Sequence, residues 1–179
     1  MSMADDPFQD SGPAAGWSIP DATLPSLATG SRLALPGLTE LHVWLLSVDG
    51  GAPQQAASPL LNVLDDRERA RAGRYRQAEA QARFRLTRAG LRLLLGRYLG
   101  CDPDALHFTA NPHGTPRLEG IGEDQGLVFN VSHSGCLAVL AFAAARPLGV
   151  DLECCRPGRD YRRLARSALT DTEQAAWRA

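Results

Sequence analysis

Two apolar runs on either side of Ser134-Gly135 constrain the fold of this chain more than any other feature. Residues 127–131 and 137–142 each have the length of a strand, and the small residues between them favour a tight turn. The pattern therefore predicts an antiparallel hairpin. A further strand is predicted to open at Pro147-Leu148 and to run through Glu153.

A buried strand and two helices are predicted before this hairpin. Residues 41–48 are mostly apolar and end at an Asp-Gly-Gly sequence, as buried strands often do. Residues 60–72 place leucines on one face and charged residues opposite, which predicts a helix that Gly73 interrupts. A longer helical pattern covers residues 77–99, with Gly100 suited to the C-terminal cap. The buried stripe of this second helix is expected to comprise Phe84, Leu91, Leu94, Leu95 and Leu99.

The two ends of the chain differ from this central part. Residues 1–38 are rich in Pro, Gly, Ser, Ala and Asp, so we expect a disordered arm without a core of its own. Residues 159–169 predict a short helix, and Thr170 and Glu173 then have the spacing of a capping box. The helix that begins after Thr170 has room for only about two turns before Ala179. We therefore expect the chain to be truncated at its C-terminus.

The composition is that of an ordinary globular protein. With 179 residues and 44% apolar side chains, the chain can build one core or two small lobes that share one. Its formal net charge of −1 gives no strong overall field toward nucleic acid or membrane. The N-terminus lacks the basic start and apolar stretch of a signal peptide, and residues 136–145 are too short a run to span a bilayer. The four cysteines lack zinc-site spacing and indicate reduced thiols, so we expect a soluble, cytoplasmic protein.

All 19 basic residues are arginines, and many of them gather between positions 67 and 97. Arginine binds phosphate through two parallel hydrogen bonds, so this run is suited to a ligand that carries phosphate. For any single arginine of the run, the solvated face of a helix is the more common explanation. A nucleic-acid interface is a third interpretation, but we expect no nucleic-acid partner, because the chain has no cluster of base-stacking aromatic residues and no net positive charge.

Asp151 and Glu153 form the first part of a candidate site. Residues two apart on a strand point to the same face, about 6.6 Å apart along it. Two such carboxylates repel each other unless a cation or a proton lies between them, and oxygen ligands favour Mg²⁺. An isolated pair of this kind most often lies on an exposed strand face. Here the flanking predicted strands are almost wholly apolar, which favours a metal site.

Ser132, His133 and Ser134 form the second part of the candidate site, at the end of the first hairpin strand. Two hydroxyls around an imidazole can bind phosphate, and histidine titrates near neutral pH. A serine hydrolase is the competing interpretation, which we set aside because the Gly-x-Ser-x-Gly pattern of a nucleophile elbow is absent from the sequence. The three residues alone also leave open a simple polar turn.

The order of these residues resembles the central signature of the surfactin-type 4′-phosphopantetheinyl transferases. The signature comprises Phe-Asn-Val-Ser-His-Ser-Gly at residues 129–135, an apolar hairpin, and Leu-Gly-Val-Asp-Leu-Glu at residues 148–153. Three upstream features resemble the family in order and spacing, namely the strand at residues 43–45, the helix with Arg83, Arg88 and Arg92, and the turn at residues 113–116. The resemblance covers residues 41–177.

The resemblance implies an α+β, 4′-phosphopantetheinyl transferase-like fold of two similar α/β lobes, with coenzyme A in the cleft between them. Residues 1–38 would then be the disordered arm, residues 39–143 the first lobe, and residues 144–179 the start of an incomplete second lobe. It also implies a Mg²⁺-dependent transferase that moves 4′-phosphopantetheine from coenzyme A to a serine of an apo acyl or peptidyl carrier protein. Such carrier proteins are acidic as a class, so the arginine-rich helix could steer them. We expect a monomer without a membrane partner.

The resemblance also implies roles for residues of the candidate site. Asp151 and Glu153 would bind Mg²⁺ at the pyrophosphate of coenzyme A, and with His133 they are the implied catalytic residues. We expect the three side chains to face one common cavity. His133 and Arg83 would contact the phosphates of coenzyme A, and Ser132 would lie beside them.

Two departures from the family pattern accompany these assignments. Gly114 and Thr115 would lie at the nucleotide end of the cleft, but the family commonly has a lysine where this chain has Thr115. Arg117 is the nearby residue that can replace this charge. The family also carries a Trp-x-x-Lys-Glu motif on a later helix, and a chain without lysine cannot contain it. We therefore expect this segment alone to be weak or inactive, and the alternative function is a remnant that only binds coenzyme A or a carrier protein.

Overall fold

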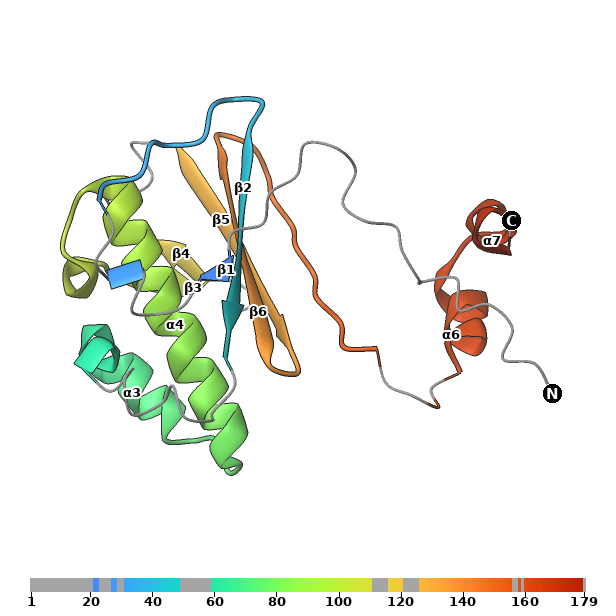
Figure 1. Cartoon of the computed structure of the whole chain (residues 1–179), viewed down its shortest axis with the longest axis horizontal. Coiled ribbons are helices and arrows are strands. Elements are labelled where there is room, and N and C mark those ends of the chain that lie inside the picture. Colours follow the sequence, from blue (N-terminus) through green and yellow to red (C-terminus); the bar gives the residue numbers. More distant parts are fainter. Residues whose placement is uncertain are drawn as a thin grey trace.

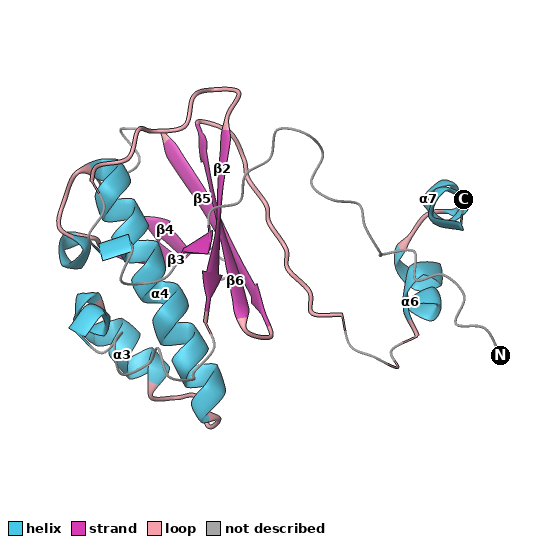
Figure 2. Ribbon diagram, in the orientation of Figure 1, coloured by secondary structure: helices cyan, strands magenta, loops and turns pink. Residues whose placement is uncertain are grey.

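The computed structural model describes residues 21–22, 27–28, 31–48, 59–110, 116–120, 126–155, 158 and 160–178. A four-stranded sheet with the order β1-β2-β6-β5 lies at the centre of the described part (Figure 1). Helix α4 packs along one face of this sheet, and α3 lies on the side of α4 that is away from the strands (Figure 2). The mixture of helices and strands agrees with the predicted α+β class.

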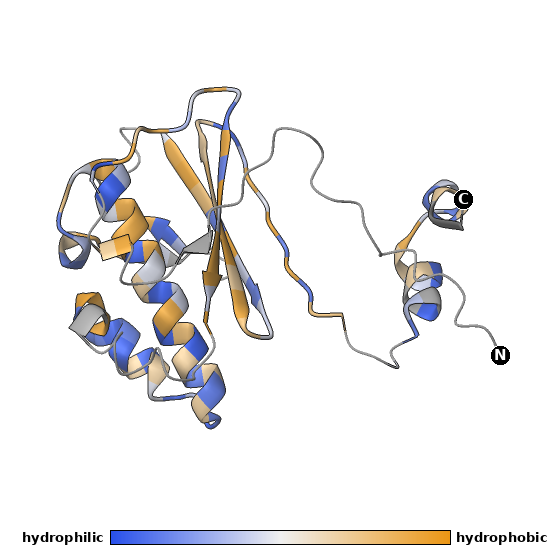
Figure 3. Ribbon diagram, viewed as in Figure 1, coloured by the Kyte–Doolittle hydropathy of each residue, from blue (hydrophilic) through white to orange (hydrophobic). Residues whose placement is uncertain are grey.

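Strand β6 (Leu137–Ala144) is an inner strand that organises this sheet. It pairs antiparallel with β2 (Leu41–Ser47) on one side and with β5 (Leu127–Ser134) on the other. Every residue of β6 except the first and last is buried, which explains why its sequence is apolar throughout instead of alternating (Figure 3). The predicted first strand and the predicted hairpin are therefore confirmed.

The turn between β5 and β6 uses a glycine at a position that requires it. Ser134 and Leu137 are register partners, so Gly135 and Cys136 alone form the turn. Gly135 has a φ of +58°, in the left-handed region that a residue with a Cβ adopts only with strain. The N–H of Val48 donates to the Cys136 carbonyl at 2.7 Å, which ties the turn to the end of β2.

Helix α4 (Ala78–Leu99) confirms the helix predicted over residues 77–99 and supplies one side of the core. It ends at Gly100, whose φ of +69° and N–H bond to the Gly96 carbonyl match the predicted C-cap. The core side chains include Leu91, Leu94, Leu95, Tyr98 and Leu99 from α4, together with Leu127, Phe129, Leu140 and Phe142 from the sheet. Phe84, which was expected in the same stripe, is only partly buried and packs against Tyr75.

The helix predicted over residues 60–72 is in fact two elements. A short 3₁₀ helix η1 (Pro59–Val63) precedes α3 (Asp66–Ala72), and Asp65 between them has an extended backbone. The Asp65 carboxylate accepts from the Glu68 N–H at 2.8 Å, and the Glu68 carboxylate accepts from the Asp65 N–H at 3.1 Å. This capping box starts a new helix. The prediction missed it because no glycine or proline marks the break within residues 60–72.

The strand predicted from Pro147 to Glu153 was wrong. Residues 147–155 form no helix or strand, although they run beside the sheet in Figure 1. The segment is hydrogen-bonded to side chains of β5. A strand would instead be hydrogen-bonded to the backbone of β5. Apolar residues at alternate positions indicate an extended chain, but they do not show whether a partner backbone lies within reach.

The N-terminal residues that the structure describes contact the main body. β1 (Asp21–Ala22) pairs parallel with β2, and Leu27 is only 2% exposed and belongs to the core. These contacts differ from the expectation of an arm without a core. A separate two-stranded sheet of β3 (Phe108–Ala110) and β4 (Pro116–Leu118) follows α4 and the short 3₁₀ helix η2 (Pro103–Ala105).

Two short helices end the described chain. Figure 1 shows α6 (Tyr161–Ala168) and α7 (Asp171–Arg178) standing apart from the sheet and from α4. The predicted capping box is confirmed, since the N–H and the hydroxyl of Thr170 both donate to Glu173 at 2.8 Å, and these bonds lower the pKa of the Glu173 carboxyl. None of the helices in the described ranges combines the length and the apolar run that crossing a bilayer requires.

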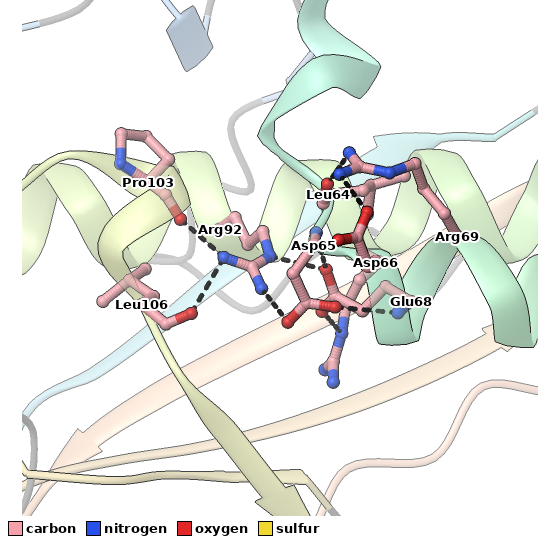
Figure 4. A network of polar contacts seen from close by, with 9 residues as sticks. Leu64, Asp65, Asp66, Glu68, Arg69, Arg92, Pro103 and Leu106 are labelled. Carbon is pink, nitrogen blue, oxygen red and sulfur yellow. Dashed lines mark hydrogen bonds and ion pairs between the residues drawn. The ribbon is translucent and has the colours of Figure 1, made fainter.

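One fully buried arginine joins α3, α4 and the residues that follow α4. The Arg92 side chain is 0% exposed, and four of its N–H groups have partners (Figure 4). Nε donates to Glu68 at 2.7 Å and Nη2 donates to Asp65 at 2.8 Å. Nη1 donates to the carbonyl oxygens of Pro103 and Leu106 at 2.8 and 2.9 Å. A buried charge is tolerated only when it is paired in this way.

Arg88 completes this buried network. Its guanidinium pairs with Glu68 and lies 4.1 Å from the centre of the Phe108 ring. Burial lowers the pKa of Arg88, and the charge of Glu68 opposes that shift. Arg88 and Arg92 are therefore neither a solvated helix face nor free to bind a phosphate-bearing ligand, because Glu68 and Asp65 already neutralise them.

Replacing Glu68 with glutamine should destabilise the protein strongly. The variant keeps the shape of the side chain but leaves two buried guanidinium groups facing a neutral amide. We expect Glu68→Gln to lower the free energy of unfolding by about 3–5 kcal/mol, measured by urea denaturation.

Asp66→Asn is the matched control for this measurement. Its side chain is 97% exposed and pairs with the exposed Arg69, so its loss should cost less than about 1 kcal/mol. Equal midpoints for the two variants would show that the buried network does not stabilise the fold.

Candidate functional site

The candidate site is built on alternate residues of β5. Leu127 and Phe129 are buried, and Val131 packs against the core, so these side chains face α4. Side chains two residues apart on a strand share a face. The alternate side chains, which include Asn130, Ser132 and Ser134, therefore point to the opposite face of the sheet.

These three polar side chains hold the segment that follows β6. Asn130 Nδ2 donates to the Leu148 carbonyl at 3.1 Å. The Leu152 N–H donates to Ser132 Oγ at 3.1 Å, and the Cys154 N–H donates to Ser134 Oγ at 3.0 Å. The residue numbers of the bonded partners increase together in β5 and in this segment, so the segment runs parallel to β5. We call residues 148–154 the acidic segment, because it carries both candidate metal ligands.

Ser132 also contacts the first of these carboxylates. Its hydroxyl donates to Asp151 Oδ1 at 3.0 Å, so the structure brings these two predicted site residues together. Asp151 and Glu153 are both exposed, and their oxygens are accessible to a cation. No group of three or more His, Cys, Asp or Glu side chains in the described ranges is arranged to hold a metal ion. Two exposed carboxylates still fit Mg²⁺, which usually takes one or two protein carboxylates and completes its shell with water and phosphate.

His133 has a different orientation from its neighbours. Since side chains alternate along a strand, the His133 side chain leaves β5 on the face opposite to Ser132. The imidazole is exposed and does not share a face with Asp151 as the sequence prediction required. β5 is nevertheless the outer strand of its sheet, so a long ligand that crosses this edge can reach both faces.

Arg83 lies in the second turn of α4 and is partly buried. The beginning of α4, the helix that carries Arg83, lies at the same end of the sheet as the β5–β6 turn in Figure 1. Gly114 and Thr115 fall outside the described residues. The described chain resumes at Pro116, with Arg117 exposed on β4.

A second polar cluster, in the core, has a structural role. Tyr98 packs between the sheet and α4, and its hydroxyl accepts from Trp44 Nε1–H at 3.0 Å and lies 2.8 Å from His42 Nδ1. Burial raises the pKa of Tyr98, while the hydrogen bond from Trp44 opposes that shift. These side chains satisfy each other inside the body of the protein. No local sequence pattern could predict this cluster, because Tyr98 lies more than fifty residues from both His42 and Trp44.

Comparison with known proteins gives the relationship of this chain to a family. A sequence profile described as "4′-phosphopantetheinyl transferase, N-terminal" matches residues 52–145. This region includes Arg83, Ser132 and His133, and it ends before Asp151 and Glu153.

Two curated relatives are similar over most of this chain. The 4′-phosphopantetheinyl transferase HetI of Nostoc sp. is 38% identical over 135 residues, which cover 73% of this chain and 56% of the relative. The putative 4′-phosphopantetheinyl transferase slr0495 of Synechocystis sp. is 38% identical over 140 residues, which cover 76% of this chain and 53% of that relative. The chain thus spans about half the length of the curated relatives that it matches.

Proposed function

Because this chain belongs to the 4′-phosphopantetheinyl transferase family, we propose that it serves in the transfer of 4′-phosphopantetheine from coenzyme A to a serine of an apo acyl or peptidyl carrier protein. The arrangement follows the surfactin type. Residues 39–143 form the first of two similar lobes, and coenzyme A lies where the acidic segment leaves that lobe. Coenzyme A and the carrier protein are the substrates.

The contact between Ser132 and Asp151 is the observation that carries this proposal. It joins the two halves of the Ser-His…Asp-x-Glu pattern, which lie 19 residues apart in the chain, within one hydrogen bond. A merely polar turn at residues 132–134 would not need a carboxylate from another segment. The exposed neighbour Glu153 adds a second oxygen donor on the same tethered segment.

The charges of this region match those of coenzyme A. Its pyrophosphate and 3′-phosphate carry several negative charges, which His133 and Arg83 bind at one end of the molecule. Asp151 and Glu153 hold Mg²⁺ at the pyrophosphate. When bound, the ion neutralises the phosphates and stabilises the charge that develops on the leaving group.

The remaining work of the protein is positioning. The serine hydroxyl of the carrier protein must lie in line with the phosphorus that it attacks, and a nearby group must accept its proton. The carboxylates of Asp151 and Glu153 and the imidazole of His133, at this edge of the sheet, are groups that can accept a proton. Arg88 and Arg92 take no part in phosphate binding, because their guanidinium groups are committed to Glu68 and Asp65.

Asp151→Asn and Glu153→Gln should each lower kcat/KM for carrier-protein modification by about 10²-fold or more, because each removes a charged oxygen donor from the metal. The measurement is transfer of labelled phosphopantetheine to an apo carrier protein over a series of Mg²⁺ concentrations. Asp104→Asn, an exposed carboxylate on η2, is the matched control and should behave as the wild type. Transfer that is unaffected by either substitution would exclude the two residues as metal ligands.

His133→Ala should raise the KM for coenzyme A about 10-fold while kcat changes little, because a charge-assisted hydrogen bond to phosphate contributes roughly 1.5–3 kcal/mol. The same assay with dephospho-coenzyme A, which lacks the 3′-phosphate, tests which group His133 binds. The wild type should prefer coenzyme A, and the variant should lose most of that preference. His107→Ala removes another exposed imidazole and should change neither value. An unchanged preference in His133→Ala would remove this residue from the phosphate site.

A further inference from the structure

The acidic segment is held to β5 in an unusual way. Two neighbouring extended chains normally pair through their backbones. Here the partners from β5 are the side chains of Asn130, Ser132 and Ser134, and the partners from the acidic segment are backbone groups. The segment therefore lies over the open face of β5, where these side chains point, instead of extending the sheet.

The spacing of these bonds places a detour at the candidate ligand. From Ser132 to Ser134 the strand advances by two residues, and the segment also advances by two, from Leu152 to Cys154. From Asn130 to Ser132 the strand again advances by two, but three residues of the segment, 149–151, lie between the bonded carbonyl of Leu148 and the bonded N–H of Leu152. One additional residue is thus accommodated between the first and second bonds. Asp151 lies in this detour, and its carboxylate accepts a hydrogen bond from Ser132 of the strand.

Ser132 is the central side chain of this arrangement. Its hydroxyl accepts from the Leu152 N–H and donates its single proton to Asp151 Oδ1. One hydroxyl thereby fixes both the backbone beside the carboxylate and one of the two carboxylate oxygens. The other oxygen of Asp151 makes no hydrogen bond to the residues that the structure describes, and it remains available to a cation.

We propose that Asn130, Ser132 and Ser134 are positioning residues that hold the carboxylates of Asp151 and Glu153 in place to receive the metal ion. This inference rests on the proposed function and adds a different role for Ser132. The family resemblance implies that Ser132 lies beside the phosphates of coenzyme A. In the structure its only proton is already given to Asp151, so Ser132 acts through that carboxylate. Carboxylates that bind metals are commonly fixed by hydrogen bonds of this kind.

The test compares Ser132→Ala and Ser134→Ala with the wild type by two measurements that need no turnover. The first is amide hydrogen exchange without metal or coenzyme A. Ser132→Ala should speed exchange at Leu152, and Ser134→Ala should speed exchange at Cys154, each by about 5-fold or more. The second is calorimetric titration of Mg²⁺ in the presence of coenzyme A and without carrier protein. Ser132→Ala should weaken Mg²⁺ binding by about 10–100-fold.

Two further variants separate positioning from a general loss of structure. Ser132→Thr keeps the hydroxyl and suits a strand, so it should restore most of the metal affinity. Ser47→Ala is the matched control, because Ser47 is an exposed serine at the end of β2, beside the same hairpin, and it should leave both measurements unchanged.

Several results would overturn the inference. Unchanged exchange at Leu152 in Ser132→Ala would show that the hydroxyl does not hold the segment. Faster exchange with unchanged Mg²⁺ affinity would show a tether without a positioning role. Weaker binding of coenzyme A to Ser132→Ala in the absence of metal would make Ser132 a direct ligand. A wild type that binds neither coenzyme A nor Mg²⁺ would instead count against the proposed function. The amide exchange rates at Leu152 and Cys154 would then show whether the serine hydroxyls hold the acidic segment.

Discussion

The structure depends on the burial of one charged side chain, Arg92. A guanidinium that is 0% exposed is stable only if its N–H groups are bonded, and its partners come from two places in the chain. Asp65 and Glu68 begin α3, and the carbonyls of Pro103 and Leu106 follow α4. Satisfying this one cation therefore fixes how α3 and the segment after α4 pack around the long helix.

With one side of α4 occupied by this network, the other side packs on the sheet. Tyr98 and the leucines of α4 pack with Phe129, Leu140 and Phe142 into one core. β6 is enclosed, whereas β5 remains the outer strand with one face away from the helix. A strand in that position has polar side chains available for another segment, and the acidic segment uses them.

The candidate site was only partly predictable from the sequence. The residue types and their order at positions 132, 133, 151 and 153 predicted phosphate and metal chemistry, and the structure brings Ser132 and Asp151 into contact. The predicted strand through Glu153 was wrong, because alternation reports an extended backbone and says nothing about its partner. Alternation along β5 places His133 on the face opposite to Ser132, and the prediction of one common cavity did not take this into account.

The local sequence pattern was sufficient to predict the structure wherever a residue's conformation depends on its neighbours in the chain. The β5–β6 hairpin, the length of α4, the cap at Gly100 and the capping box before α7 belong to this group, because periodicity and short-range hydrogen bonds specify them. Only the tertiary structure determines which arginines are buried and which side chains bind the acidic segment to β5. Arg92 meets carboxylates 24 and 27 positions away, and Ser132 meets groups 19 and 20 positions away, so these partners are known only once packing has brought distant segments together.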